Sequence, residues 1–388
     1  MAKQAGEAAE TNPLPLLRLA GRGLRYRYLR LTGRPALPQA LSLELTRRCM
    51  ARCLMCNIWK TPQETPELTA ADWLGLLADP LLRDLRELDL TGGEPFLRAD
   101  LGELFAGICR LKRSHLPKLQ SIAITTNGFL SERILEVVAQ ALPVLDQAQI
   151  GLVFAFGLDA AGPLHDKIRG FPGGWQKLAG TIAGLTDLRK EHPGLVLGAK
   201  TTVTRHNIGA LDEIVRFADD HGLFTIISPY IVTPARYANL DRDDDLALAE
   251  EEIETLKRFY ASPRFQWSYF RRELLRFLEE GRMHKPCSAG FNYYFIRSNG
   301  DLHPCPLRKA KLGNVTQTPL AELIKSPAAA RLRRGIGAFA ECPACTEPGL
   351  ERYALPFEGF HYLGQLFRLG PHGLRQLHRH LGLNKYFP

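Results

Sequence analysis

The sequence of 388 residues lacks the long apolar segments that mark membrane-spanning and exported proteins. It has no apolar run of about eighteen residues, so it predicts no transmembrane helix. Residues 1–12 are polar and small and contain no apolar stretch typical of a signal peptide, so we expect a cytoplasmic protein. In a reducing compartment, the eight cysteines indicate metal or redox chemistry rather than disulfide bonds.

The sequence also lacks internal repeats, low-complexity segments and any RNA-binding motif. Its formal net charge of +9 favours an anionic partner of some kind. Because no basic stripe is interleaved with aromatic residues, we expect no nucleic acid among the partners. The hydrophobic content of 45% and the charged content of 23% are typical of a globular protein with a large core.

Six apolar, β-rich runs alternate with helix-like segments over residues 41–232. Continuous apolar runs are typical of buried parallel strands, and the alternation indicates right-handed βαβ units. Periodicity alone permits either an open doubly wound sheet or a partial barrel. The predicted strands span Leu41–Thr46, Leu85–Thr91, Gln120–Thr126, Gln149–Leu158, Val196–Thr204 and Phe224–Val232.

Three cysteines, Cys49, Cys53 and Cys56, follow the first predicted strand in the pattern C-x3-C-x2-C. Three thiolates cannot complete a four-thiolate cage, but they can hold three irons of a [4Fe-4S] cluster and leave the fourth iron open. Zinc would require a fourth Cys or His at its own spacing, and His115, the candidate downstream, has no patterned neighbours. The pattern therefore favours a cluster whose open iron binds a small molecule.

The ends of the next strands carry short motifs in the same order. The second strand runs into Thr91-Gly-Gly-Glu-Pro95, and the third ends in Thr125-Thr-Asn-Gly128. Together with the cysteine loop, these motifs resemble those of the radical SAM superfamily. The resemblance implies an α/β fold built on a partial (β/α)6 TIM-like barrel, with S-adenosylmethionine (SAM) bound at the open iron and the active site at the carboxyl ends of the strands.

The resemblance also implies cofactor-binding residues. The GGEP motif would hold the amino group of the SAM methionine, the third strand end would lie near its ribose, and an apolar residue before the third cysteine would pack on its adenine. Arginines near the fourth and fifth strands would face the SAM carboxylate or the substrate. These residues are Gly92, Gly93, Glu94, Pro95, Thr126, Asn127, Met55, Asp159, Arg169 and Arg205.

Three of these assignments keep alternatives. Arg169 can pair with the SAM carboxylate or form a surface ion pair, and Asp159 can point into the substrate cavity or cap the next helix. Arg205 can face either the SAM carboxylate or the substrate. At Gly157 the family usually has a serine that touches SAM, so we expect one polar contact to be missing.

Four more cysteines, Cys287, Cys305, Cys342 and Cys345, follow the barrel. A hairpin predicted at Asn299-Gly300 would bring the first two towards each other, and the set suits zinc or an iron–sulfur cluster about equally. The segment resembles the SPASM/twitch extension of radical SAM enzymes. Because a full SPASM domain has about seven cysteines, the four found here imply one auxiliary [4Fe-4S] cluster. Cys109 is expected to be a small buried hydrophobe.

Both ends of the chain are basic and amphipathic. The N-terminal segment predicts a helix that packs on the barrel or lies on a membrane surface, and residues 320–334 predict another helix. The tail would cover the cavity mouth, pair with the N-terminal helix or dock on lipid. We divide the chain into a basic segment, the radical SAM barrel, a helical linker, the auxiliary cluster domain and the tail: 1–37, 38–235, 236–284, 285–346 and 347–388.

The family chemistry defines the expected activity. SAM is cleaved reductively at the cluster to a 5′-deoxyadenosyl radical, which abstracts hydrogen from a substrate that the sequence does not identify: a peptide, small molecule, carbohydrate or lipid. Such an oxidoreductase or maturase needs an external electron donor such as flavodoxin or ferredoxin, and the auxiliary cluster would assist electron transfer. The alternative is a non-catalytic iron–sulfur or zinc scaffold protein.

Overall fold

The computed structural model describes residues 16–61 and 66–387. Within this part of the chain, no helix is long and apolar enough to cross a membrane. The prediction made for residues 1–12 lies outside the described residues.

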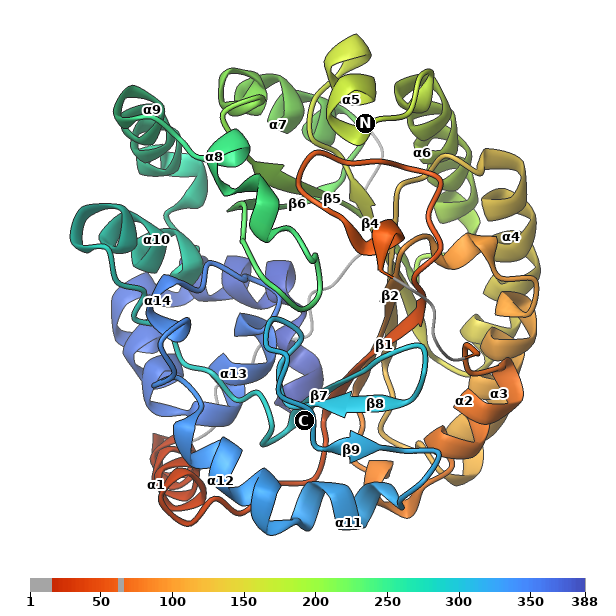
Figure 1. Ribbon diagram of the computed structural model, residues 1–388, viewed down its shortest axis with the longest axis vertical. Helices are drawn as coiled ribbons and strands as arrows, with labels where there is room; N and C mark the ends of the chain where they lie inside the picture. The colour runs from red at the N-terminus through yellow and green to blue at the C-terminus, as the bar shows by residue number, and fades with distance from the viewer. Residues whose placement is uncertain (1–15, 62–65, 388) are drawn as a thin grey trace.

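A nine-stranded sheet forms the centre of the molecule, with the strand order β6-β5-β4-β3-β2-β1-β7-β8-β9. The six strands β1 to β6 are parallel and curve into a barrel that does not close (Figure 1). The predicted partial barrel is therefore confirmed. Its strands are β1 Ala40–Thr46, β2 Glu87–Gly92, β3 Ser121–Thr126, β4 Gly151–Gly157, β5 Leu195–Val203 and β6 Phe224–Pro229.

Helices between these strands cover the outer face of the sheet (Figure 1). They are α2 Ala70–Leu77, α3 Leu101–Ser114, α4 Ser131–Gln147, α5 Gly162–Arg169, α6 Gly174–Glu191 and α7 Leu211–Asp220. Short 3₁₀ helices are η1 Ile58–Lys60, η2 Pro80–Leu82, η3 Pro95–Leu97, η4 Ile208–Ala210, η5 Leu240–Arg242, η6 Pro263–Phe265, η7 Cys342–Ala344 and η8 Leu383–Tyr386.

The two faces of the barrel strands differ in chemistry. Large apolar side chains such as Leu90 and Phe154 belong to the core between sheet and helices. Facing the barrel lumen, Ser42 lies opposite Asp89, and Asp89 lies opposite Ala123 on the next strand. The expectation of continuously apolar strands is therefore wrong for the lumen face, because alternate residues point to opposite faces of a sheet.

The C-terminal extension continues the same sheet. Strand β7 (Tyr293–Ile296) pairs in parallel with β1 and forms an antiparallel hairpin with β8 (Asp301–His303), as the Asn-Gly turn predicts. Strand β9 (Gly313–Asn314) follows at the edge. The extension thereby shares hydrogen bonds with the barrel, which sequence periodicity does not show.

The single helix predicted over residues 320–334 is wrong in its middle. The chain forms α11 (Leu320–Lys325) and then α12 (Pro327–Gly335). Pro327 has no N–H to continue the first helix and is favoured in the first turn of the second. The hydroxyl of Ser326 caps that second helix by accepting from the Ala329 N–H at 3.1 Å.

The first described helix and the C-terminal tail pack together at the amino ends of the barrel strands. The helix predicted near the N-terminus is α1 (Leu16–Thr32), and it lies against helices of the tail (Figure 1). The remaining helices are α8 Asp243–Leu246, α9 Glu250–Ala261, α10 Tyr269–Glu280, α13 Glu351–Glu358 and α14 Phe360–Leu381. The tail therefore pairs with the N-terminal helix, one of the three positions considered, and its residues also line a cavity at the amino end of the barrel.

Candidate active site

The three-cysteine loop lies at the carboxyl end of β1 and is held by backbone hydrogen bonds. The N–H groups of Arg52 and Leu54 donate to carbonyls of α5 at 2.9 Å each, and the Asn57 N–H donates to Tyr237 O at 2.8 Å. All three thiols are free and partly buried. The loop is thus fixed between the helix after β4 and the segment after β6, above the barrel lumen.

Burial makes these three thiols costly to ionise without added positive charge. It raises the pKa of Cys49 and of Cys56 to about 12 each, and it also raises the pKa of Cys53. Arg169 Nη1 lies 3.8 Å from Cys53 Sγ, and Asn127 Nδ2 lies 3.9 Å from Cys49 Sγ. The irons of a cluster would supply the missing charge, so these residues fit a [4Fe-4S] cluster held by three thiolates.

The GGEP motif packs directly against this loop. A Cβ on Gly92 would lie 2.2 Å from the Thr46 carbonyl oxygen, and one on Gly93 would lie 2.1 Å from the Arg48 carbonyl oxygen. Only glycine permits this approach of two backbones. The first role of the two glycines is therefore to fix β2 against the cysteine loop, with Pro95 opening the 3₁₀ turn that follows.

Glu94 is fully buried and points towards the third strand end. Its carboxylate accepts from the Phe96 N–H at 3.2 Å, the Asn127 N–H at 2.9 Å and the Thr126 hydroxyl at 2.8 Å. Burial outweighs these hydrogen bonds and raises the pKa of Glu94 to about 7. A carboxylate has about four acceptor positions, so this one retains capacity for an ammonium group. Thr126 and Asn127 therefore act here by orienting Glu94.

The fourth strand end forms a buried ion pair. Arg169 Nη2 lies 2.6 Å from Asp159 Oδ2, and Asp159 Oδ1 accepts from the Thr202 N–H at 2.8 Å. The surface alternative for Arg169 is wrong, since its side chain is only 14% exposed. The helix-cap alternative for Asp159 is also wrong, because Ala161 occupies that position before α5. A Cβ on Gly157 would lie 2.3–2.6 Å from the guanidinium, so Arg169 fills the space of the expected serine.

Two further predicted site residues differ in burial: Met55 is buried, whereas Arg205 is exposed. Met55 lines a small cavity beside Thr202 and Tyr237, and its contact with adenine stays a prediction. The side chain of Arg205 is exposed on the surface. The side chain of nearby Asn207 does not cap a helix but donates to the carbonyls of Asp159 and Thr202 at 2.9 and 3.0 Å.

Several polar lumen residues escaped the sequence analysis. They lie below the cysteine loop, at mid-height in the barrel: Ser42, Asp89, Lys200, Arg236 and Glu347. Burial raises the pKa of Glu347, but Lys200 and Arg236 hold it below its usual value overall. A sequence signal existed for Ser42, Asp89 and Lys200, because each is a polar residue within an otherwise apolar parallel strand.

The four auxiliary cysteines surround the β7–β8 hairpin. Burial is the main cause that raises the pKa of Cys305 well above its usual value, and the neighbouring thiols of Cys287, Cys345 and Cys342 raise it further. Among the residues described, no three His, Cys, Asp or Glu side chains converge tightly enough to hold one metal ion. Since the other three thiols act on the pKa of Cys305, the four cysteines lie near one another, and such a set can hold an auxiliary iron–sulfur cluster.

Comparisons with known proteins agree with this geometry. Residues 43–218 match the radical SAM superfamily, and residues 287–346 match the SPASM iron–sulfur cluster-binding domain. The AdoMet-dependent heme synthase of Nitratidesulfovibrio vulgaris is 27% identical over 73% of this chain and 77% of that protein. The sporulation killing factor maturation protein SkfB of Bacillus subtilis is 23% identical over 75% of this chain and 66% of that protein.

Two further matches bear on coverage and fold. Pre-heme d1 synthase of Dinoroseobacter shibae is 28% identical over 52% of this chain, and here the chain spans only 45% of the relative. The structure of Streptococcus suis SuiB bound to S-adenosylmethionine is 18% identical, covers 82% of this chain and 72% of that chain, and has a TM-score of 0.52. This likeness shows the fold.

Two of these relatives are named as synthases and the third as a maturation protein, so the scaffold alternative gains no support from them. The chain is therefore a radical SAM enzyme, in which a domain that binds a [4Fe-4S] cluster and S-adenosylmethionine precedes a SPASM domain that binds auxiliary iron–sulfur.

Proposed function

We propose that this enzyme removes a hydrogen atom from a substrate held in the barrel lumen, between its two cysteine groups. When bound, the cluster and S-adenosylmethionine supply the 5′-deoxyadenosyl radical for this step. The observation that carries the proposal is the polar lumen directly below the cysteine loop. A barrel strand needs no buried charge for stability, so side chains such as Asp89 and Lys200 indicate a binding role.

The residues at the strand ends have separate roles in this proposal. Glu94 accepts the ammonium of the methionine part, and Met55 packs on the adenine. Arg169 lies between Asp159 and Cys53 and balances charge beside the cysteine loop. It reaches the SAM carboxylate only by sharing its guanidinium with Asp159. Arg205 takes no part, because its side chain is on the surface.

Of the auxiliary cysteines, Cys305 lies beside the lumen, since its neighbour Pro306 lines it. This position supports a role for one auxiliary [4Fe-4S] cluster in electron transfer with the substrate. The substrate itself is open, because the relatives are named for heme synthesis and for the maturation of a sporulation killing factor. The electron for SAM cleavage would come from an external donor such as flavodoxin or ferredoxin.

One experiment tests the proposal. The protein is reconstituted anaerobically with iron and sulfide, and SAM and dithionite are added. We expect about eight irons per chain and formation of 5′-deoxyadenosine, which Cys53→Ala abolishes and the matched variant Cys109→Ala retains. Bound zinc, or clusters that do not cleave SAM, would contradict the proposal.

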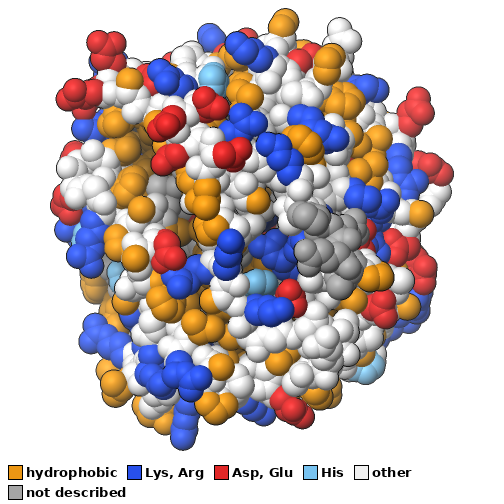
Figure 2. Space-filling view, in the orientation of Figure 1, with side chains coloured by type: hydrophobic (Ala, Val, Ile, Leu, Met, Phe, Trp, Pro, Cys, Tyr) orange, Lys and Arg blue, Asp and Glu red, His pale blue; other side chains and the backbone are white. Residues whose placement is uncertain are grey.

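We further propose that the protein stays in the cytoplasm and that α1 contacts an anionic membrane surface. The apolar row predicted on this helix faces outward: Leu17 is 86% exposed, Leu24 64% and Leu31 80%. The described parts of α1 and α14 contain no acidic residue and many arginines. Figure 2 shows Lys and Arg side chains gathered at the lower left, where Figure 1 places α1 and α12. Such a surface suits anionic lipid.

Vesicle sedimentation tests this contact. We expect the protein to bind phosphatidylglycerol vesicles at low salt, to bind less at 0.5 M salt (about a 4 Å screening length), and to bind phosphatidylcholine weakly. Replacing Leu17, Leu24 and Leu31 with serine should abolish binding, whereas Leu240→Ser, an exposed leucine elsewhere, should not. Equal binding by both variants would contradict a role for α1.

A further inference from the structure

The lumen contains three adjoining cavities in a row from the carboxyl to the amino ends of the strands. The upper and middle cavities have volumes of about 30 and 50 Å³ and share the lining residues Lys200 and Glu347. The lower cavity has a volume of about 640 Å³ and shares Val153, Phe224 and Arg352 with the middle one. Organic ligands occupy cavities of about 300–1,000 Å³, so the lower cavity has the size of a ligand site.

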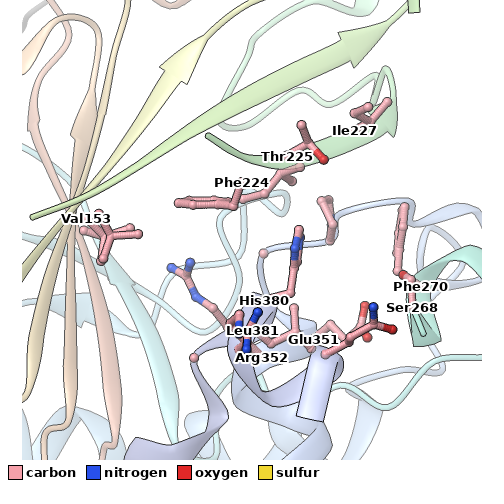
Figure 3. A pocket seen from close by; sticks show the side chains of 18 of the residues that line it. Val153, Phe224, Thr225, Ile227, Ser268, Phe270, Glu351, Arg352, His380 and Leu381 are labelled. Carbon is pink, nitrogen blue, oxygen red and sulfur yellow. The ribbon is translucent and has the colours of Figure 1, made fainter. Parts of the chain in front are cut away.

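Apolar side chains form most of the lower cavity. Figure 3 shows Val153 of β4 and Phe224 of β6 on one side and residues of α13 and α14, including His380 and Leu381, on the other. Trp267 and Phe270 complete the wall from the linker and α10. Burial lowers the pKa of His380 to about 4, so its imidazole is neutral. The cavity therefore suits an apolar body of ring or chain size.

The middle cavity, in contrast, contains two cations that form no direct ion pair, although the carboxylates of Asp89 and Glu347 also line it. Arg236 donates to the Thr91 hydroxyl at 2.8 Å, and its guanidinium lies 5.7 Å from the Phe295 ring centre. Within the described part of the chain, neither Lys200 nor Arg236 has a carboxylate oxygen within 4 Å. Partly buried cations that lack a direct ion pair favour an anionic group between them.

We propose that the lumen binds an amphiphilic anion, whose anionic group lies between Lys200 and Arg236 and whose apolar part fills the lower cavity. The molecule is the substrate, an assignment that rests on the proposed function. The anionic end then lies just below the upper cavity and Met55, next to the reacting end of the barrel. The apolar end extends away from the cysteine loop towards α14.

A pair of fluorescent probes tests this arrangement in the reconstituted protein. The probes are 1-pyrenebutyrate and its uncharged counterpart 1-pyrenebutanol, both read by pyrene emission. We expect the acid to bind at least tenfold more tightly than the alcohol. The double variant Lys200→Met and Arg236→Met should remove this preference while the alcohol still binds. Equal affinity for acid and alcohol in the wild type would overturn the proposal.

A second test fills the lower cavity with a large side chain. Val153→Trp should weaken both probes at least tenfold, and Val144→Trp, a matched change on the exposed face of α4, should leave both unchanged. If Val153→Trp does not fold, Val196→Trp at the 43% exposed rim of the cavity replaces it. Unchanged binding in the folded cavity variant would place the probe elsewhere and overturn the proposal.

An assay of SAM cleavage by the wild type and by Val144→Trp distinguishes a failure of the amphiphile proposal from a failure of the proposed function. If dithionite and SAM yield 5′-deoxyadenosine but pyrenebutyrate does not bind, the amphiphile proposal fails and the proposed function stands. If pyrenebutyrate binds as expected but no SAM is cleaved, the binding site stands and the proposed function fails.

Discussion

At the scale of single residues, Gly157 shows how one missing side chain rearranges a site. The guanidinium of Arg169 occupies the volume that a Cβ on residue 157 would need. It is held there by its ion pair with Asp159 and its contact with the Cys53 sulfur. The motif in the sequence suggests a lost SAM contact. The structure shows a gained ion pair, which the sequence could not reveal because Gly157 and Arg169 lie on different elements.

Gly157→Ala should therefore destabilise the protein. The new methyl group forces the pinned guanidinium to move, and overpacking of this kind costs about 1–3 kcal/mol. Gly180→Ala is the matched control, because a Cβ there meets nothing within 4 Å in the interior of α6 and should stabilise by about 0.5–1 kcal/mol. Urea unfolding of both variants measures the difference, and a neutral Gly157→Ala would refute the packing argument.

The buried Glu94 makes SAM binding depend on pH. Burial raises the pKa of this carboxyl to about 7, and only its charged form accepts an ammonium. Affinity for SAM should therefore fall about tenfold between pH 8 and pH 6. The stability of the free protein changes in the opposite sense: the contribution of Glu94 is complete below pH 4.5 and is lost as the pH rises through 7.

Calorimetric titration of SAM at several pH values measures this dependence. Glu94→Gln should bind SAM more weakly at pH 8 and show a flatter pH profile. A wild-type profile that is flat between pH 6 and 8 would mean that another group holds the ammonium.

At the scale of elements, Glu87, the first residue of strand β2, joins this strand to the C-terminal tail. Its carboxylate lies 2.7 Å from Arg352 Nη2 and 2.6 Å from Lys385 Nζ, and Lys385 also donates to the Ser121 hydroxyl at 2.7 Å. Burial raises the pKa of Glu87, but the two cations hold it below its usual value overall. The tail thus closes the amino end of the barrel through one buried charge network.

Glu87→Gln should lower the free energy of unfolding by about 3–5 kcal/mol, because it leaves two buried cations without their carboxylate. The matched control is Glu136→Gln on the exposed side of α4, which should change stability by less than about 0.5 kcal/mol. The pKa of Glu87 is lowered, so its stabilisation is present above pH 4.5 and is lost below it in acid. Equal unfolding curves for the two variants would show that this charge network does not stabilise the packing of the tail on the barrel.

The elements that sequence predicted well are those whose signal is local. The six strands, the helices between them and the Asn-Gly hairpin follow from periodicity and turn chemistry. The break at Ser326-Pro327 was missed, although its signal is also local, since proline has no N–H to donate. The pairing of β7 with β1 and the packing of the tail against α1 join residues far apart in the chain, and no local pattern specifies them.

At the scale of the whole molecule, one continuous sheet connects the two cysteine groups. β7 carries the auxiliary hairpin and pairs with β1, while β1 leads directly into the three-cysteine loop. The Tyr26 hydroxyl of α1 also donates to the Cys287 carbonyl, so the N-terminal helix contacts the auxiliary site. The barrel and the extension should therefore unfold as a single cooperative unit.

Scanning calorimetry of the reconstituted protein tests this coupling. The double variant Cys342→Ser and Cys345→Ser removes two auxiliary ligands, and metal binding contributes directly to folding free energy. We expect one transition, shifted as a whole to lower temperature, because the lost stability is shared through β1 and β7. Cys109→Ser changes one buried thiol in α3 and should shift the same transition less. Two separate transitions, with only one displaced, would show that the extension unfolds on its own and that the shared sheet does not couple the two sites.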